Sequence, residues 1–230
     1  MKGREGLEPV GPGDDHEQMI LIGHYDSPFV RRVAIALILY DMPFEHRAWS
    51  VFADAEKIAP FNPLRRVPTL VLDDGEALIE SAAILDGLDE MAGPERALIT
   101  ARGPERRRVL KVCALAAGLA DKAVSLVYER VLHERVTAQW VDRCQGQMEA
   151  VLDVLEAERW AAVGPWWFGE TMTHADIIVA CAMRFVREAH EGLFDLAAWP
   201  ALAAHWERCE ALPSFQAVVK PFFVALPAKG

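Results

Sequence analysis

With 230 residues, the chain is long enough for one large domain or two of ordinary size. A composition of 52% hydrophobic and 25% charged residues supplies a core and excludes global disorder. The formal net charge of −10 argues against nucleic acid as a partner, because a phosphate backbone needs a basic face.

Residues 1–18 are polar and lack the apolar centre of a signal peptide, so we interpret them as a flexible N-terminal extension. No apolar run approaches the roughly 20 residues of a membrane span, which predicts no membrane partner. The cysteines have no CxxC spacing and fall in helix-like segments, so we expect buried, reduced side chains and a cytoplasmic location. They are Cys113, Cys144, Cys181 and Cys209.

The first half of the chain alternates strand and helix patterns. An apolar run predicts a strand over residues 19–25, after which Ser27 can cap a helix with Pro28 at its first position. The elements predicted next are a helix over 29–40, a strand over 44–49, a short helix over 51–59, a hairpin around 73–75 and a helix over 80–91. A strand–helix–strand unit implies parallel neighbours, and the hairpin adds an antiparallel edge.

Beyond residue 93 nearly every segment has helical periodicity. After a linker over 97–104, the sequence predicts helices over 105–133, 137–160, 173–190, 199–212 and 214–224. The third of these begins with Thr173-His174-Ala175-Asp176, a capping box that we interpret as structural. We therefore predict a small α/β domain over residues 19–96, followed by an all-helical bundle domain over 104–226.

The segment from Val67 to Ser81 indicates a binding edge. Pro68 stands at the start of a strand, where proline removes a donor from the hydrogen-bond ladder. A cis Val67–Pro68 bond would explain this, turning the amide and carbonyl of Val67 outward toward an extended peptide. Ser81, at the start of the following helix, offers a hydroxyl and free amides to a carboxylate. These features suit a short, anionic, peptide-like molecule.

Ser27 is the first candidate for chemistry. A hydroxyl beside the unpaired amides of a helix start favours an anion, and donation to a thiolate would lower the pKa of that sulfur. The alternative interpretation is a plain N-cap, which stabilises the helix by about 1 kcal/mol. Tyr25 is a rival hydroxyl, although strand alternation makes it more suited to packing.

Further charged residues could complete a ligand site. Glu80 could meet an ammonium group while Ser81 meets a carboxylate, although helix capping explains the pair about as well. Arg65 and Arg66 could attract a second carboxylate, or be solvated loop charges. The seven histidines show no metal-ligand spacing, and no GxGxxG or Walker-type loop exists, so we expect neither metal nor nucleotide.

Taken together, SPFVRRVAIAL (27–37), RRVPTLV (65–71), ALIESAAIL (77–85) and the capping box resemble a cytosolic glutathione transferase of the serine-type, tau, zeta or bacterial-like branches. The resemblance extends over residues 19–223. It implies a thioredoxin-like N-terminal domain, a helical C-terminal domain, a homodimer, a role in detoxification, and glutathione as co-substrate, bound mainly by the first domain.

Matched position by position, the resemblance implies a role for each motif residue. Ser27 would be the catalytic hydroxyl that stabilises the glutathione thiolate. Val67, beside a cis Pro68, would pair its backbone with the cysteinyl part of glutathione. Glu80 and Ser81 would hold the γ-glutamyl end.

Other positions match less closely. Arg66 takes the place of a basic residue that faces the glycyl carboxylate, and Asp176 that of the capping acid. A second basic residue expected in the region after Trp49 is not obvious, and Lys57 or Arg47 could substitute. The motif is S-P-F where other branches carry cysteine or S-S-C, which argues against thiol–disulfide chemistry and gives less support to maleyl isomerisation.

The resemblance implies conjugation of glutathione to an apolar electrophile. Residues expected by geometry to contact that electrophile are Phe29, the Val112–Leu119 face, Tyr128, and the Phe222-Phe223 tail. Alternatives are a glutathione-dependent isomerase or dehalogenase acting on an intermediate of aromatic degradation, and a non-catalytic glutathione-binding stress protein.

Overall fold

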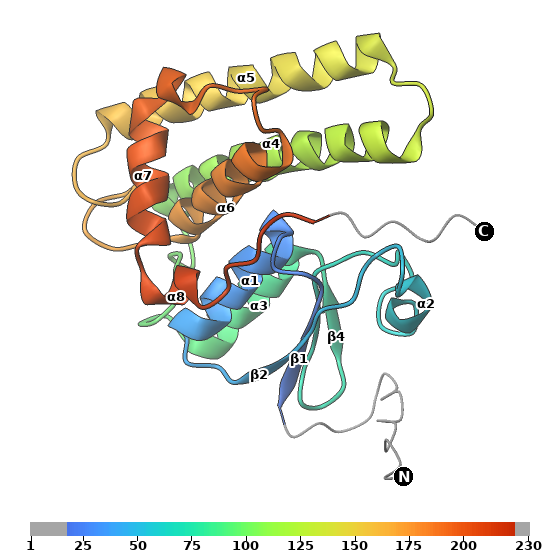
Figure 1. The fold of residues 1–230 in the computed structure, drawn as a ribbon. Coiled ribbons are helices and arrows are strands. Elements are labelled where there is room, and N and C mark those ends of the chain that lie inside the picture. The colour runs from blue at the N-terminus through green and yellow to red at the C-terminus, as the bar shows by residue number, and fades with distance from the viewer. Residues whose placement is uncertain (1–17, 224–230) are drawn as a thin grey trace.

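The computed structural model describes residues 18–223, and its first part is a four-stranded sheet in the order β2-β1-β3-β4 (Figure 1). The strands are β1 (Met19–Ile22), β2 (Phe44–Arg47), β3 (Thr69–Val71) and β4 (Ala77–Ile79). β1 and β2 are parallel, whereas β3 is antiparallel to both β1 and β4. The predicted combination of a parallel pair and an antiparallel hairpin is confirmed.

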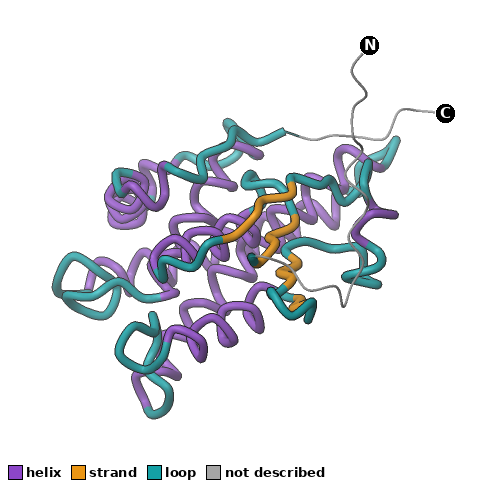
Figure 2. The backbone as a smooth tube through the Cα atoms, turned by 90° about the horizontal axis from the view of Figure 1, so that it is seen from below, coloured by secondary structure: helices purple, strands orange, loops and turns teal. Residues whose placement is uncertain are grey.

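Helices cover both faces of this sheet. α1 (Pro28–Leu39) and α3 (Ser81–Ala92) lie on the side of the helical domain, and α2 (Ala55–Ile58) lies on the other (Figure 1). Because successive side chains of a strand point to opposite faces, Leu21 of β1 packs with α1 and α3, whereas Ile20 and Ile22 pack with Ile58 of α2. Figure 2 shows the strands as one compact group with helices stacked behind them.

The second part of the chain is helical. Its elements are α4 (Pro104–Leu132), α5 (Ala138–Ala161), α6 (His174–Ala189), the 3₁₀ helix η1 (Leu196–Ala198), α7 (Pro200–Glu210) and α8 (Pro213–Gln216). α6 is central, since it packs against α4 and α7 and also against α1 of the first domain. The capping box at its start is confirmed: the Asp176 carboxylate accepts from the amide and hydroxyl of Thr173.

A buried ion pair fastens the two domains. The Arg31 guanidinium of α1 makes a bidentate contact with the Glu210 carboxylate of α7, at 2.5 and 2.8 Å. The same guanidinium donates to the carbonyls of Phe215 and Val218, and Arg184 of α6 also pairs with Glu210. The surface of α1 that faces away from the sheet is therefore held by the helical domain.

Two predicted helices differ from the structure. The helix expected over 51–59 is reduced to α2. The Ser50 hydroxyl accepts from the amides of Phe52 and Ala53, so the chain forms a turn there before the helix begins. The helix expected over 214–224 is wrong over residues 217–223, and residue 224 lies outside the described residues. Pro221 supplies no amide donor, and the tail instead runs along α1 between the domains (Figure 1).

Other predictions have different outcomes. The predicted domain ranges, 19–96 and 104–226, stay predictions, and the extension predicted over 1–18 lies, apart from Gln18, outside the described residues. All four cysteines are free thiols, and Cys144, Cys181 and Cys209 are buried. Within residues 18–223, no helix combines the length and apolarity needed to cross a membrane.

Candidate active site between the domains

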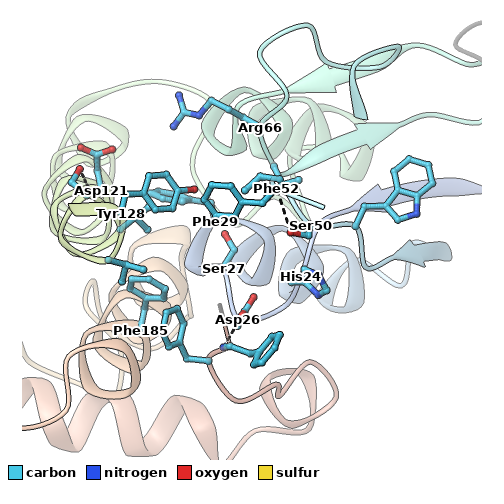
Figure 3. A pocket seen from close by; sticks show the side chains of 18 of the residues that line it. His24, Asp26, Ser27, Phe29, Ser50, Phe52, Arg66, Asp121, Tyr128 and Phe185 are labelled. Carbon is cyan, nitrogen blue, oxygen red and sulfur yellow. Dashed lines mark hydrogen bonds between the residues drawn. The ribbon is translucent and has the colours of Figure 1, made fainter. Parts of the chain in front are cut away.

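A cavity of about 530 Å³ opens between the two domains (Figure 3). The first domain lines it from the loops around β1, β2 and β3, and the helical domain lines it from α4, α6 and the tail. Its lining residues include His24, Asp26, Ser27, Phe29, Phe52, Arg65, Arg66, Val67, Asp121, Tyr128, Phe185 and Phe223. One wall therefore carries Ser27, Arg66 and Val67 from the predicted glutathione site, and the opposite wall is mostly apolar.

Ser27 lies at the floor of this cavity, half-buried at the N-terminus of α1. The hydroxyl oxygen accepts from the Val30 amide at 3.4 Å, which leaves its proton free to be donated. Tyr25 does not line the cavity, because its ring stacks on His46 with centroids 3.7 Å apart. Of the two hydroxyls considered from the sequence, that of Ser27 lines the cavity and that of Tyr25 does not.

Val67 presents a backbone edge next to Ser27. The Val67–Pro68 bond is cis, as predicted, and no hydrogen bond is recorded from residues 18–223 to the Val67 amide or carbonyl. Gly23 permits this approach, because it adopts φ of 127° and has no Cβ atom. A Cβ atom added at this position would lie 2.6 Å from a Val30 methyl and 2.8 Å from the Cβ of Val67. Pro68 itself is buried behind the edge and does not line the cavity.

Glu80 and Ser81 lie beside the cavity rather than in its wall. Glu80 has φ of 65° and provides no side-chain cap to α3, so the first amides of that helix are left for another acceptor. Its carboxylate lies 3.4 Å from the Arg66 guanidinium, and the two side chains are 57% and 59% exposed. The two charged groups proposed to meet opposite ends of a ligand contact each other here.

The Ser81 side chain has a partner that the sequence did not indicate. Ser81 is only 4% exposed, and its hydroxyl oxygen accepts from Nη2 of the buried Arg32 at 2.6 Å. Arg32 has no recorded ion pair in the described part of the chain, and its Nε atom is buried without a partner. An arginine has no acceptor atom, so the Ser81 proton stays available to an anion at the start of α3.

The substitutes considered for a second basic residue lie elsewhere. Arg47 pairs with Glu45 and Lys57 with Asp54, and both cations stack over Trp49. Neither lines the cavity, whereas Arg65 does.

The apolar wall includes most of the residues expected to contact the electrophile. Phe29, Tyr128 and Phe223 line the cavity. Val112 does not: it is buried in the core of the helical domain, which corrects its assignment. The stretch of α4 that reaches the cavity begins at Asp121, and the residues missed there are Asp121, Val124, Ser125 and Val127. Their helical spacing was visible in the sequence, but nothing in it showed which turn of the helix meets the first domain.

The C-terminal tail closes one side of the cavity. The Phe223 amide donates to Asp26 at 3.1 Å, the Phe222 amide donates to Glu188 of α6 at 2.9 Å, and Lys220 Nζ lies 2.7 Å from Nδ1 of His24. Burial, followed by the Lys220 charge, lowers the pKa of His24, so its neutral ring can accept from the ammonium group. Both domains therefore hold the tail.

Metal binding has no visible basis in the part of the chain that the structure describes, since no group of three or more His, Cys, Asp or Glu side chains is arranged to hold an ion.

Comparison with known proteins defines the class. Residues 21–96 match the family model for the glutathione S-transferase N-terminal domain, and residues 138–208 match the model for the C-terminal domain. The chain belongs to the glutathione S-transferase family. The fold is the thioredoxin-like domain plus helical domain that the sequence predicted, and the expectation of an enzyme of this family is confirmed at the level of the family.

The individual relatives are moderately similar. An Escherichia coli K12 protein described as an uncharacterized GST-like protein, YibF, is 32% identical over 73% of this chain and 82% of its own length. Maleylacetoacetate isomerase of Pseudomonas aeruginosa is 29% identical over 86% of this chain and 94% of its own. Both cover most of the described residues.

Solved structures agree with this assignment. A glutathione S-transferase of Methylobacterium radiotolerans, in complex with glutathione sulfonate, superposes with a TM-score of 0.84 at 27% identity, covering 92% of this chain and 99% of that one. A family member from Pseudomonas fluorescens with bound glutathione gives a TM-score of 0.78 at 30% identity, covering 89% and 100%.

Proposed function

We propose that this protein is a glutathione transferase in which Ser27 stabilises the glutathione thiolate and an apolar electrophile binds against the helical wall. The observation that supports this best is the position of the Ser27 hydroxyl. It lies at the N-terminus of a 12-residue helix, in the floor of a cavity whose opposite wall is mostly apolar. A helix N-terminus favours an anion, and the hydroxyl can donate to it.

The unpaired edge at Val67 supports the proposed orientation of glutathione. The cysteinyl part would pair with the Val67 backbone, which puts its sulfur near Ser27. Arg66 would meet the glycyl carboxylate, while Glu80 and Ser81 would hold the ammonium and carboxylate of the γ-glutamyl end. Binding would then replace the exposed Arg66–Glu80 contact, which at this exposure contributes about 0–1 kcal/mol.

The chemistry that we propose is nucleophilic attack by the substrate's own sulfur. The bound thiol releases its proton to solvent, the Ser27 hydroxyl donates to the thiolate, and the sulfur attacks the electrophile. The protein supplies orientation and stabilisation of the anion. No metal or nucleotide is needed for this step.

Replacing Ser27 with alanine tests the proposal. Removing a preorganised donor to an anion costs about 10²–10³-fold in turnover, so we expect a loss of this order with an aryl halide, with glutathione affinity largely kept. The pKa of the bound thiol, followed by the ultraviolet absorbance of the thiolate, should rise. Ser125→Ala is the matched control, because that pocket hydroxyl donates to the Asp121 carbonyl. Unchanged turnover and thiol pKa in Ser27→Ala would reject the role of Ser27.

A second candidate is a glutathione-dependent isomerase, supported by the similarity to maleylacetoacetate isomerases over most of the chain. Dehalogenation of an aromatic-degradation intermediate would use the same site. A substrate panel separates these reactions: isomerisation regenerates free glutathione, whereas transfer consumes it.

A non-catalytic glutathione-binding protein is the remaining alternative. Binding to immobilised glutathione without turnover on the panel would favour it, and failure to bind would reject the transferase and favour an interaction protein that keeps only the fold. The homodimer and cytoplasmic location stay predictions. Sedimentation equilibrium of the purified chain tests the first, and imaging of a tagged chain in its source cell tests the second.

A further inference from the structure

His24 brings an unpaired hydrogen-bond donor to the cavity. Its ring is half-buried and lines the cavity, and its Nδ1 atom lies 2.7 Å from the Lys220 ammonium group of the C-terminal tail. An ammonium group can only donate, so Nδ1 is the acceptor and the neutral ring has its proton on Nε2. No hydrogen bond from Nε2 is recorded within residues 18–223. Lys220 therefore fixes the tautomer whose N–H is available to a ligand.

The Lys220 charge also strengthens this donor. Burial, followed by that charge, lowers the pKa of His24, so the ring is neutral at neutral pH. Asp26 and Asp54 act on the ring in the opposite direction, but Asp26 accepts from a tail amide and Asp54 pairs with Lys57. Lys220 itself has no ion pair recorded in the described part of the chain. Because linked hydrogen bonds polarise one another, the ammonium group makes the N–H of the ring a better donor to an anion.

His24 lies at the end of the cavity that the glycyl part of glutathione would reach. Figure 3 shows His24 on the opposite side of Ser27 from Tyr128 and Phe185. In the proposed orientation, the sulfur lies near Ser27 and the γ-glutamyl end lies at the start of α3. An extended tripeptide spans about 10 Å, so its glycyl carboxylate lies beyond the sulfur. A carboxylate is better accommodated by the donor of His24 than by the mostly apolar wall.

The other cations near the cavity leave room for a second partner of this carboxylate. Arg66 contacts Glu80 and must leave it to reach the glycyl end. Lys57 and Arg47, the substitutes considered from the sequence, do not line the cavity. His24 does, and its donor is already oriented by the tail.

We propose, building on the proposed binding of glutathione, that the C-terminal tail completes the glutathione site. The Nε2 atom of His24 donates to the glycyl carboxylate, and Lys220, behind the ring, is a positioning residue that fixes the tautomer and polarises the N–H. Arg66 can meet the second oxygen of the same carboxylate. The affinity for glutathione then depends on a residue of the tail as well as on the first domain.

The decisive experiment compares glutathione with its glycyl monoethyl ester, in which that carboxylate has no charge. Calorimetric titration at pH 8, where a histidine ring is neutral, gives Kd for each compound. In both His24→Phe and Lys220→Met we expect glutathione to bind about tenfold more weakly, a loss typical of a hydrogen bond to a charged group. The ester should keep its Kd within about threefold, which shows that the pocket is intact. Lys220→Arg should keep most of the preference for glutathione, because a guanidinium can also donate to Nδ1.

Lys111→Met is the matched control, because it removes an exposed positive charge that pairs with Glu158 and does not line the cavity. Both Kd values should stay the same in this variant. Equal losses for glutathione and the ester, or a loss in only one of the His24 and Lys220 variants, or in neither, would overturn the proposal. A wild-type protein that binds both compounds equally would overturn it and leave the transferase standing, whereas binding of neither would reject the transferase as well.

Discussion

The buried guanidinium of Arg32 donates a 2.6 Å hydrogen bond to the hydroxyl oxygen of Ser81, linking the middle of α1 to the first residue of α3. Arg32 is 4% exposed, burial lowers its pKa, and no carboxylate pairs with it in the described chain. A buried cation that lacks a counter-ion favours an anion nearby. The contact with Ser81 brings Arg32 to the start of α3, whose first amides have no side-chain cap and where the proposed γ-glutamyl carboxylate would lie.

Arg32→Met should therefore weaken the binding of glutathione without a matching loss of folding stability. We expect glutathione to bind about tenfold more weakly, a loss typical of a hydrogen bond that involves a charged group. The free energy of unfolding should change by less than about 1 kcal/mol or increase, because an unpaired buried charge is removed. Calorimetric titration and urea unfolding measure the two quantities. Arg32→Lys should restore part of the affinity, and an affinity loss matched by a comparable loss of stability would contradict this role.

The tail should control binding of the electrophile. Ending the chain after Pro221 removes Phe222, whose ring packs edge-on against Phe185 at 5.3 Å, together with Phe223. An aromatic contact of about 0.5–1.5 kcal/mol corresponds to about a 2- to 12-fold rise in KM for the apolar substrate. KM for glutathione should stay the same. Ending the chain after Phe223 is the control, and equal effects of the two truncations would show that the phenylalanines are not responsible.

The ion pair between Arg31 and Glu210 should dominate the stability of the domain interface. In Glu210→Gln, Arg31 stays buried without a counter-charge, and we expect the free energy of unfolding to fall by about 3 kcal/mol or more. Lys111→Met removes an exposed pair with Glu158 and should cost no more than about 1 kcal/mol. Chemical denaturation measures both variants. Similar losses of unfolding free energy in the two variants would mean that the buried pair stabilises the protein no more than the exposed pair does.

The contact between His24 and Lys220 should weaken as the pH falls. Because the pKa of His24 in the folded chain is below its ordinary 6.5, the unfolded chain binds this proton first, and stability declines as pH drops through 6.5 toward the folded value. Asp26 and Asp54 raise the pKa, against burial and Lys220. In Lys220→Met the pKa of His24, followed by NMR, should move upward. No upward shift would show that the Lys220 charge does not act on this ring.

Much of the candidate site could be predicted from the sequence, because short motifs of adjacent residues specify it. Ser27 before Pro28 specifies a helix start, and Pro68 next to Val67 specifies a strand edge that cannot continue the ladder. Each of these signals depends on residues adjacent in the chain, so a short motif is enough to predict it. The order of strands and helices follows for the same reason, because each element carries its own periodicity.

Only the tertiary structure decided which surfaces face one another. The periodicity of α4 is continuous, yet Val112 is buried in the helical core whereas Tyr128, farther along the same helix, reaches the cavity. The partnership of Arg32 with Ser81 and the path of the tail over α1 likewise join segments far apart in sequence. Such contacts depend on how the two domains dock, which is set by packing across α1 and α6 and by the pair of Arg31 with Glu210. No pattern within one segment encodes that arrangement.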